Sequence, residues 1–337
     1  MTASTKLLEV TDLAVDFHTD RGIAHAVRGV SFALSAGETL GIVGESGCGK
    51  SVTAMSLLRL LPEPPAAVLA GSRIHFRGED VLAAPPERVR AIRGAGIGMI
   101  FQEPMTSLNP VFTVGEQVAE TIREHEGGSK AAVRQRVIDL LGRVGIPDPA
   151  RRYRAYPHQL SGGLRQRVMI AIALACGPDL LIADEPTTAL DVTIQAQILA
   201  LLAELRDELG MALLLISHDL AVVSQVADRV AVMYAGRIVE QGRVPDLFRA
   251  PGHPYTRGLL GALPRVDAPP GPLAAIPGRV PDPYGEPAGC PFAPRCPEVM
   301  DRCRSHDPPD FPTSSGTARC WLNEPEPGAD TGGGGTG

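Results

Sequence analysis

The sequence predicts an α/β protein with three parts: a parallel β-sheet covered by helices, a helical block inserted into that sheet, and a small C-terminal region. Short, wholly apolar runs alternate with segments of helical periodicity, as at residues 180–183 and 194–209, which is typical of strands buried on both faces of a sheet. Residues 113–176 have a mostly helical pattern. About half of the 31 prolines and four of the six cysteines lie beyond residue 263.

Each expected element has its own signal. Alternating or continuous apolar runs predict strands at residues 7–17, 27–34, 39–43, 96–101, 180–183, 212–217 and 229–234. Apolar residues spaced three and four apart predict helices at 50–61, where Pro62 ends the pattern, at 194–209 and just after His218. The helical block has a break at 145–149. We expect an α/β domain at 1–265 with a helical subdomain at about 103–176, a C-terminal extension at 266–322 and a disordered tail at 323–337.

Composition limits the class of protein. The chain has 337 residues, of which 44% are hydrophobic and 21% are charged, enough to bury a sizeable core. Its formal net charge of −6 argues against a protein whose main ligand is nucleic acid. Because the sequence lacks an apolar run of the ~18 residues that span a membrane, and its start lacks a secretory signal pattern, we expect a soluble chain.

A phosphate-binding loop stands between the strand expected at 39–43 and the helix that follows it. Its residues fit the pattern G-x-x-x-x-G-K-[ST] and are Gly44, Glu45, Ser46, Gly47, Cys48, Gly49, Lys50 and Ser51. Glycines let backbone N–H groups point at phosphate oxygens, and the following helix adds the positive end of its dipole. Lys50 is expected to reach the β- and γ-phosphates, and the Ser51 hydroxyl to bind Mg²⁺. Cys48 occupies a variable position of this loop.

Two carboxylates follow the apolar run at 180–183. A buried strand would bring Asp184 to the sheet edge beside the phosphate loop, where it is expected to hold Mg²⁺. Glu185, one residue further, is placed to polarise a water for attack on the γ-phosphate. Neither acid is specific alone, but together with the phosphate loop they predict a nucleoside-triphosphatase.

A second anion-binding device precedes a later apolar helix. Ser161 is the expected N-cap, and Gly162 and Gly163 leave backbone N–H groups accessible at the positive helix end. One nucleotide does not need two such loops from one chain. We therefore expect this second loop to serve the nucleotide of another subunit.

These three motifs, in this order, resemble the nucleotide-binding subunit of ATP-binding-cassette (ABC) transporters over residues 6–262. The resemblance implies that two subunits enclose two ATP molecules, each held by the phosphate loop of one subunit and the Ser161 loop of the other. It implies that Gln102 senses Mg²⁺ and the attacking water, that Asp191 belongs to the D-loop at residues 188–191 and contributes to ATP binding, and that His218 contacts the γ-phosphate. Phe17 stands where an aromatic ring stacks on adenine, although such a ring also suits ordinary packing.

The end of the sequence indicates which branch of this family the chain resembles. The segments 253–256 (His-Pro-Tyr-Thr), 276–278 (Ile-Pro-Gly) and 289–297 (Gly-Cys-Pro-Phe-Ala-Pro-Arg-Cys-Pro) are similar to the C-terminal extension of oligopeptide, dipeptide and nickel importer ATPases. This similarity extends to about residue 322.

The extension holds four cysteines: Cys290, Cys296, Cys303 and Cys320. A disulfide framework needs an oxidising compartment, which does not suit an ATP-consuming protein without a signal segment. Unrelated thiols are one alternative; four thiolates binding Zn²⁺ or a 4Fe–4S cluster are the others, and ligand type alone does not separate these two. The paired C-x₂-C spacing of structural zinc is absent. The resemblance favours the 4Fe–4S cluster, because it implies one in the matching extension.

The resemblance implies an ATP-hydrolysing motor subunit of a di- or oligopeptide importer, bound peripherally to the cytoplasmic face of the cell membrane. Its expected partners are a second ABC ATPase (a paralogue or a copy of itself), two integral-membrane permease subunits that dock on residues 103–112 and the helical block, and an extracytoplasmic substrate-binding protein.

A nickel or other small-solute importer would use the same motor. A soluble ABC ATPase acting on DNA or ribosomes is disfavoured, since the sequence has neither a second cassette nor a long coiled-coil insertion. Intact Lys50, Asp184, Glu185 and His218 disfavour an inactive, purely regulatory cassette.

Overall fold

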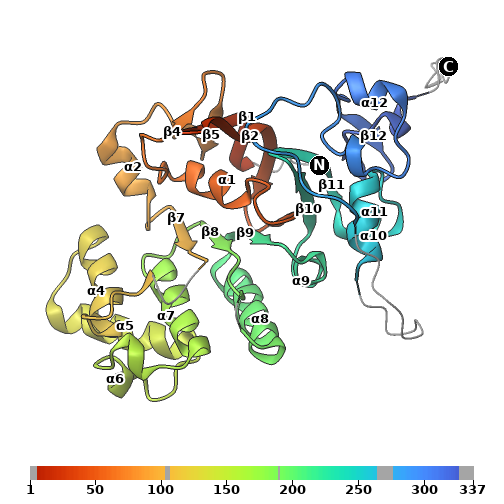
Figure 1. The fold of residues 1–337 in the computed structure, drawn as a ribbon. Coiled ribbons are helices and arrows are strands. Elements are labelled where there is room, and N and C mark those ends of the chain that lie inside the picture. The colour runs from red at the N-terminus through yellow and green to blue at the C-terminus, as the bar shows by residue number, and fades with distance from the viewer. Residues whose placement is uncertain (1–5, 103–106, 189, 264–275, 326–337) are drawn as a thin grey trace, which may run out of the picture.

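The computed structural model describes residues 6–102, 107–188, 190–263 and 276–325, and two β-sheets organise them (Figure 1). The first sheet is antiparallel, with the order β2–β1–β5–β6 and β4 paired to β1. Its strands are β1 (Lys6–Thr19), β2 (Gly22–Ser35), β4 (Ala66–Val68), β5 (Arg73–Phe76) and β6 (Glu79–Asp80). The strands predicted at 7–17 and 27–34 thus form a long hairpin apart from the parallel sheet.

The second sheet has eight strands in the order β12–β13–β11–β10–β3–β9–β8–β7. The central pairs, from β10 to β7, are parallel, and the pairs that join β10, β11, β13 and β12 are antiparallel. The strands are β3 (Thr39–Val43), β7 (Ile97–Ile100), β8 (Leu180–Asp184), β9 (Ala212–Ser217), β10 (Arg229–Tyr234), β11 (Arg237–Arg243), β12 (Phe311–Thr313) and β13 (Gly316–Ala318). The bounds of β3, β9 and β10 are those predicted from sequence.

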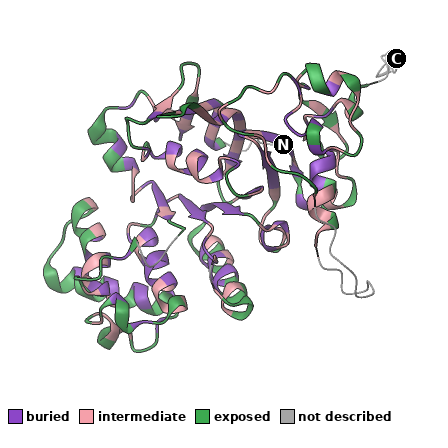
Figure 2. Ribbon diagram, viewed as in Figure 1, coloured by how far each residue is buried: buried purple, intermediate pink, exposed green. Residues whose placement is uncertain are grey.

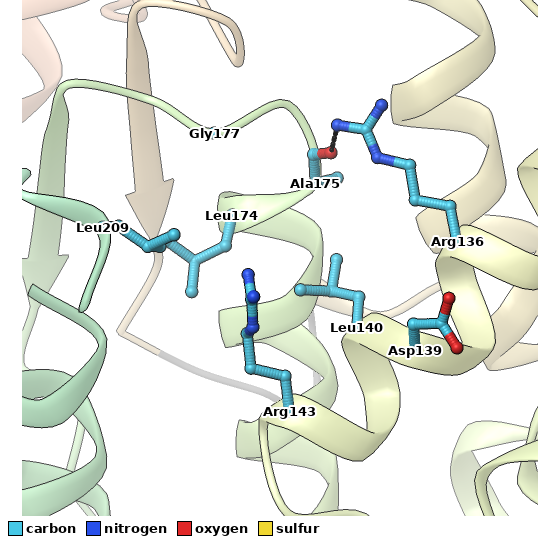
Figure 3. Close-up of a pocket in the computed structure, with 8 residues that line it drawn as sticks. All are labelled: Arg136, Asp139, Leu140, Arg143, Leu174, Ala175, Gly177 and Leu209. Carbon is cyan, nitrogen blue, oxygen red and sulfur yellow. Dashed lines mark hydrogen bonds between the residues drawn. The ribbon is translucent and has the colours of Figure 1, made fainter.

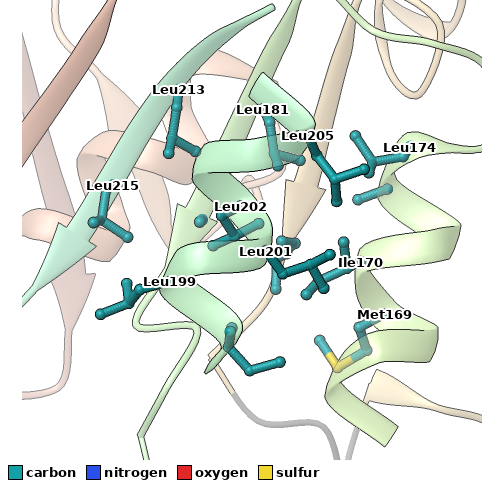
Figure 4. Packing of buried hydrophobic residues seen from close by; sticks show 14 of the residues in the cluster. Met169, Ile170, Leu174, Leu181, Leu199, Leu201, Leu202, Leu205, Leu213 and Leu215 are labelled. Atoms are coloured by element: carbon teal, nitrogen blue, oxygen red, sulfur yellow. The ribbon is translucent and has the colours of Figure 1, made fainter. Parts of the chain in front are cut away.

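The central strands are apolar throughout because both faces of the sheet are covered. Leu181, Leu213 and Leu215 face one cluster, built with α7 (Gly162–Leu174) and α8 (Val192–Leu209) (Figure 4). Ile182 and Leu214 face the other cluster, which includes α1 (Lys50–Leu57) and the antiparallel sheet. Figure 2 shows the resulting buried layer between helices whose outer surfaces are exposed. The two-sided burial explains why these runs could be recognised as strands.

Helices flank the sheets and form the predicted block. Those outside the block are α1 (Lys50–Leu57), α2 (Pro86–Ile92), α8 (Val192–Leu209), α9 (Leu220–Ser224), α10 (Val244–Arg249) and α11 (Pro254–Gly261). The helix predicted at 50–61 ends earlier, at Leu57, because the chain turns there and Arg59 takes a positive φ of 50°. In the described ranges, no helix is both long and apolar enough to cross a membrane.

The helical block lies between β7 and β8 in the chain and projects from one end of the sheet (Figure 1). It consists of α4 (Val114–His125), α5 (Lys130–Arg143), α6 (Pro149–Arg152), the 3₁₀ turn η1 (Pro157–Gln159) and α7 (Gly162–Leu174). The hydroxyls of Thr113 and Ser129 cap α4 and α5 by accepting bonds from Glu116 N and Ala132 N. The predicted break at 145–149 separates α5 from α6.

The C-terminal extension packs against the body and continues its main sheet. It contains η2 (Ala293–Arg295), α12 (Asp301–Ser305), β12, β13 and η3 (Trp321–Asn323), and β13 pairs with β11. Sequence reasoning missed this pairing because three-residue strands leave too short a pattern. Asn323, at the start of the predicted tail, donates from Nδ2 to Gly252 O at 3.0 Å. Most of that tail (326–337) and the start of the predicted extension (266–275) lie outside the described residues.

Candidate nucleotide-binding site

The phosphate loop leaves the buried strand β3 and enters α1, as the sequence predicted. Gly47 and Gly49 have positive φ values of 80° and 101°, which favour glycine. A Cβ on Gly44 would overlap the carbonyl oxygen of Met233, and one on Gly49 would overlap that of Ala26. The loop therefore needs its glycines for sterics as well as for conformation.

Lys50 and Ser51 begin α1 and meet the end of β8. The Lys50 ammonium is buried, donates to the carbonyl oxygens of Gly44 at 2.8 Å and Glu45 at 3.2 Å, and lies 3.9 Å from Glu185 Oε1. Ser51 Oγ donates to Asp184 Oδ1 at 3.1 Å. Ser51 and Asp184, two of the side chains expected to contact Mg²⁺, are thus in contact across α1 and β8. Burial raises the pKa of Asp184. A cation bound beside this carboxyl group would lower its pKa and favour the charged form.

The Glu185 carboxylate contacts most of the polar side chains around this site. It has a positive φ of 46°, and its N–H donates to Ile216 O on β9 at 2.9 Å, which fixes the turn after β8. Its Oε2 accepts from Thr188 Oγ1 at 2.8 Å and Gln102 Nε2 at 3.3 Å, and lies 3.2 Å from His218 Nδ1. Non-glycine residues with positive φ are uncommon and often lie at functional sites.

Of these groups, Lys50, Ser51, Gln102 and Glu185 line one pocket, and Asp184 and His218 are not among its described lining residues. Within the described part of the chain it is lined by Ala26, Ser46, Gly47, Gly49, Lys50, Ser51, Val52, Gln102 and Glu185. Backbone N–H groups, a lysine and two potential magnesium ligands stand beside a carboxylate placed to accept a proton. These groups are those needed to bind a triphosphate and to activate a water molecule for attack on its γ-phosphate.

Three predicted nucleotide contacts lie elsewhere. Phe17 is half-buried near the end of β1, where it packs against the cluster under the antiparallel sheet. Asp191 caps α8 by accepting from Ile194 N at 2.9 Å. Ser161 is the N-cap residue of α7 as predicted but, within the described ranges, its hydroxyl makes no capping bond. Ser161 and Gly162 are exposed on the helical block, and their roles toward a nucleotide stay predictions.

The four late cysteines line one apolar pocket in the C-terminal extension, together with Phe292, Trp321 and other residues. All six cysteines of the chain are free thiols. Burial raises the pKa of Cys290 and of Cys320 to about 11, and Cys303 adds to the shift of both. In the described residues, groups of three or more His, Cys, Asp or Glu side chains that could hold a metal ion are absent.

Another pocket lies where α5 approaches the ends of α7 and α8, away from the phosphate loop (Figure 3). Arg136 donates from Nη2 to Ala175 O at 2.9 Å and pairs with Glu126. Arg143 lies 3.1 Å from Glu208. Both arginines that line this pocket therefore already have partners, and we assign it no chemistry.

Sequence reasoning missed two residues that contact the phosphate loop from the C-terminal side. Arg295 pairs with the Glu45 carboxylate, and Tyr255 Oη accepts from Glu45 N at 3.0 Å. Both residues lie in segments that the resemblance had singled out, but neither segment carries a pattern that predicts contact with a loop some 210 or 250 positions earlier.

The fold and this site define a P-loop nucleoside-triphosphatase with an inserted helical subdomain. Two family models match the chain: "ABC transporter" over residues 27–188 and "Oligopeptide/dipeptide transporter, C-terminal region" over residues 239–303. The chain belongs to the ABC transporter family. The second match begins in β11, earlier than the boundary at 266 that composition had suggested.

Relatives of known sequence cover nearly the whole chain. It is 53% identical to the dipeptide transport ATP-binding protein DppD of Bacillus subtilis over 95% of both chains. It is also 53% identical to DppD of Escherichia coli, over 90% of this chain and 92% of the relative. A putative peptide import ATP-binding protein of Brucella abortus is 53% identical over 95% of this chain and 97% of the relative.

Solved structures agree with the fold. The dimeric ATP-binding cassette MJ0796 in a post-hydrolysis state bound to ADP and Pi has a TM-score of 0.63 and 27% identity, covering 70% of this chain and 98% of that one. CbiO1 of Clostridium perfringens, part of an ABC transporter complex, has a TM-score of 0.62 and 29% identity, covering 73% of this chain and 91% of that one.

Proposed function

We propose that this chain is the ATP-hydrolysing motor subunit of an ABC importer that takes up dipeptides or oligopeptides. The observation that carries the proposal is the combination of an intact phosphate site with the peptide-transporter type of C-terminal region. The identity of 53% to dipeptide transport subunits over 95% of the chain supports the substrate class.

Each side chain of the site has a role in hydrolysis. The phosphate loop and Lys50 hold the triphosphate, and Ser51, Asp184 and Gln102 are the residues that would hold Mg²⁺. Bound Mg²⁺ would neutralise charge that develops on the phosphate oxygens. Glu185 accepts a proton from the attacking water, and His218 and Gln102, both in contact with the Glu185 carboxylate, hold it in place.

A second subunit would complete the nucleotide-binding site. Ser161 is not among the described residues that line the phosphate-loop pocket, and it is exposed at the N-terminus of α7. Backbone N–H groups at such a helix end attract phosphate. We propose that this surface closes over the ATP of a partner ATPase, either a paralogue or a second copy, and that Phe17 contributes to the base side.

Coupling to membrane subunits is proposed at the junction of β7 and the helical block. Phe101, Val111 and Phe112 are exposed there, and Gln102 beside them contacts Glu185. Permease subunits that press on these apolar side chains would therefore act on the catalytic carboxylate. Residues 103–106 of the predicted docking surface lie outside the described residues. The chain would sit peripherally at the cytoplasmic face of the inner membrane, with an extracytoplasmic binding protein delivering the peptide.

We also propose that Cys290, Cys296, Cys303 and Cys320 bind a 4Fe–4S cluster. Support comes from the convergence of the four side chains on one pocket and from the resemblance of this extension to those of peptide importer ATPases. A single Zn²⁺ needs all its sulfur ligands about 2.3 Å from one point, whereas a cluster takes one thiolate for each of its irons. The number of cysteines in this pocket matches the four irons of a cluster.

Uptake by cells tests the transport function. We expect a Glu185→Gln change at the native locus to abolish accumulation of a labelled dipeptide while uptake of labelled Ni²⁺ stays at the parent level. Loss of Ni²⁺ uptake with normal dipeptide uptake would replace the peptide assignment by the nickel importer. Anaerobic co-purification of the tagged chain should recover two integral-membrane proteins.

The cluster is tested on anaerobically purified protein. We expect iron and sulfide in equal amounts and a broad absorbance in the blue that is lost when all four cysteines are changed to Ser. Cys176→Ser is the matched control, because Cys176 lies near the end of α7 and outside the four-cysteine pocket. Stoichiometric zinc without iron would instead support the Zn²⁺ alternative.

A further inference from the structure

A partly buried ion pair joins the C-terminal extension to the phosphate loop. The guanidinium of Arg295 binds the Glu45 carboxylate through two bonds, from Nη1 to Oε2 at 2.9 Å and from Nη2 to Oε1 at 3.1 Å. The Arg295 side chain is only 5% exposed, whereas that of Glu45 is 29% exposed. Paired bonds of this kind fix orientation as well as distance.

Arg295 is itself held on several sides. Its Nε donates to Pro277 O at 2.8 Å and its Nη2 to Ile276 O at 3.1 Å. Its Nη1 also donates to the Tyr234 hydroxyl at 3.3 Å. These hydrogen bonds fix the position of the guanidinium group, so the extension presents a rigid group to the phosphate loop.

Glu45 connects this group to the catalytic lysine. Its carboxylate binds Arg295, its N–H donates to the Tyr255 hydroxyl at 3.0 Å, and its carbonyl oxygen accepts from Lys50 Nζ at 3.2 Å. A shift of Glu45 therefore moves the carbonyl that orients Lys50, together with the backbone that would face the phosphates.

We propose that Arg295 is a positioning residue for ATP binding, which makes the C-terminal extension a structural part of the nucleotide site. Arg295 acts through Glu45 and Lys50 and does not itself touch the phosphates. This inference rests on the ATP-hydrolysing function proposed above.

The variants separate geometry from charge. Arg295→Lys keeps the charge but loses the paired bonds, Arg295→Met removes both, and Glu45→Gln keeps the shape of the other partner. Removing one charge of such a pair destabilises a protein strongly, so Arg295→Lys, which keeps both charges, keeps the test valid if Arg295→Met or Glu45→Gln does not fold. The control is Arg257→Met, which breaks an exposed pair with Glu298 in the same region.

The measurement is the affinity for Mg·ATP and the rise in Tm that saturating Mg·ATP produces, all in a Glu185→Gln background that prevents turnover. A residue that only stabilises the fold lowers Tm equally with and without nucleotide, whereas a positioning residue also reduces the rise that nucleotide causes. We expect Arg295→Lys and Glu45→Gln each to weaken Mg·ATP binding about tenfold, the double variant to be no weaker than either, and Arg257→Met to match the background.

Affinities of Arg295→Lys and Glu45→Gln within about twofold of the background protein would overturn the inference. Additive losses in the double variant would also overturn it, since two residues that act through one contact are not independent. If the background protein itself bound no Mg·ATP, the proposed function would fail as well, so the two failures are distinguishable.

Discussion

At the scale of single residues, the site depends on one carboxylate with several partners. Glu185 contacts Thr188, Gln102 and His218 through one oxygen, while Lys50 lies 3.9 Å from the other. The contact between Gln102 and Glu185 links the proposed docking surface to the carboxylate proposed as the catalytic base. Small changes at this carboxylate should therefore affect hydrolysis more than nucleotide binding.

The change Glu185→Gln tests this role. The amide keeps the shape of the side chain but accepts no proton, so we expect ATP hydrolysis to fall at least about 100-fold while bound ATP is retained. Phosphate release and nucleotide retention after gel filtration measure the two effects. Glu204→Gln, at an exposed position of α8, is the control. Hydrolysis within tenfold of the parent rate would rule out Glu185 as the base.

Gly44 gives a second residue-scale prediction. Its missing Cβ leaves room for Met233 O and for Cys48 Sγ, so Gly44→Ala should push the loop out of its position and weaken Mg·ATP binding at least about tenfold. Gly261→Ala is the matched control, because a Cβ there meets no atom within 4 Å. Equal affinities of the two variants, measured by equilibrium dialysis, would contradict the steric argument.

At the scale of elements, sequence predicted those whose burial is complete and missed those that depend on distant partners. β3, β9 and β10 were predicted to the residue because both their faces are apolar. The strands β12 and β13 were missed because each is three residues long and exists through pairing with β11. The same division holds at the site, where Lys50 and Glu185 lie in local motifs, whereas Arg295 reaches Glu45 only through tertiary packing.

The packing of α8 on the sheet should be sensitive to cavities. Leu202 on α8 is fully buried against the parallel strands (Figure 4). Leu209, at the end of the same helix, is 37% exposed. We expect Leu202→Ala to lower the free energy of unfolding by about 2–5 kcal/mol and Leu209→Ala by clearly less. Urea unfolding measures both. Losses of equal size would show that α8 does not pack as described.

At the scale of the whole molecule, the phosphate loop and the Ser161 loop lie on different parts of the chain. The first belongs to the main sheet, and the second begins α7 in the helical block that projects from it (Figure 1). Two chains facing each other would bring unlike loops together.

Ser161→Arg tests this arrangement. The bulky cation should block closure on the partner's nucleotide, so the complex with its co-purified ATPase partner should lose Mg·ATP-dependent association, while each phosphate loop still binds ATP. Light scattering in a Glu185→Gln background measures association. Ser314→Arg, at an exposed position of the extension, is the control. Unchanged association and full hydrolysis by the Ser161→Arg complex would overturn the shared-site arrangement.

The pairing of β13 with β11 has a consequence for how the protein is synthesised. Until Gly316–Ala318 leave the ribosome, the outer side of β11 has no covering strand, and its N–H and C=O groups can pair with any extended segment nearby. A shortened gene product that stops before Gly316 would keep that edge permanently open and would be prone to aggregate.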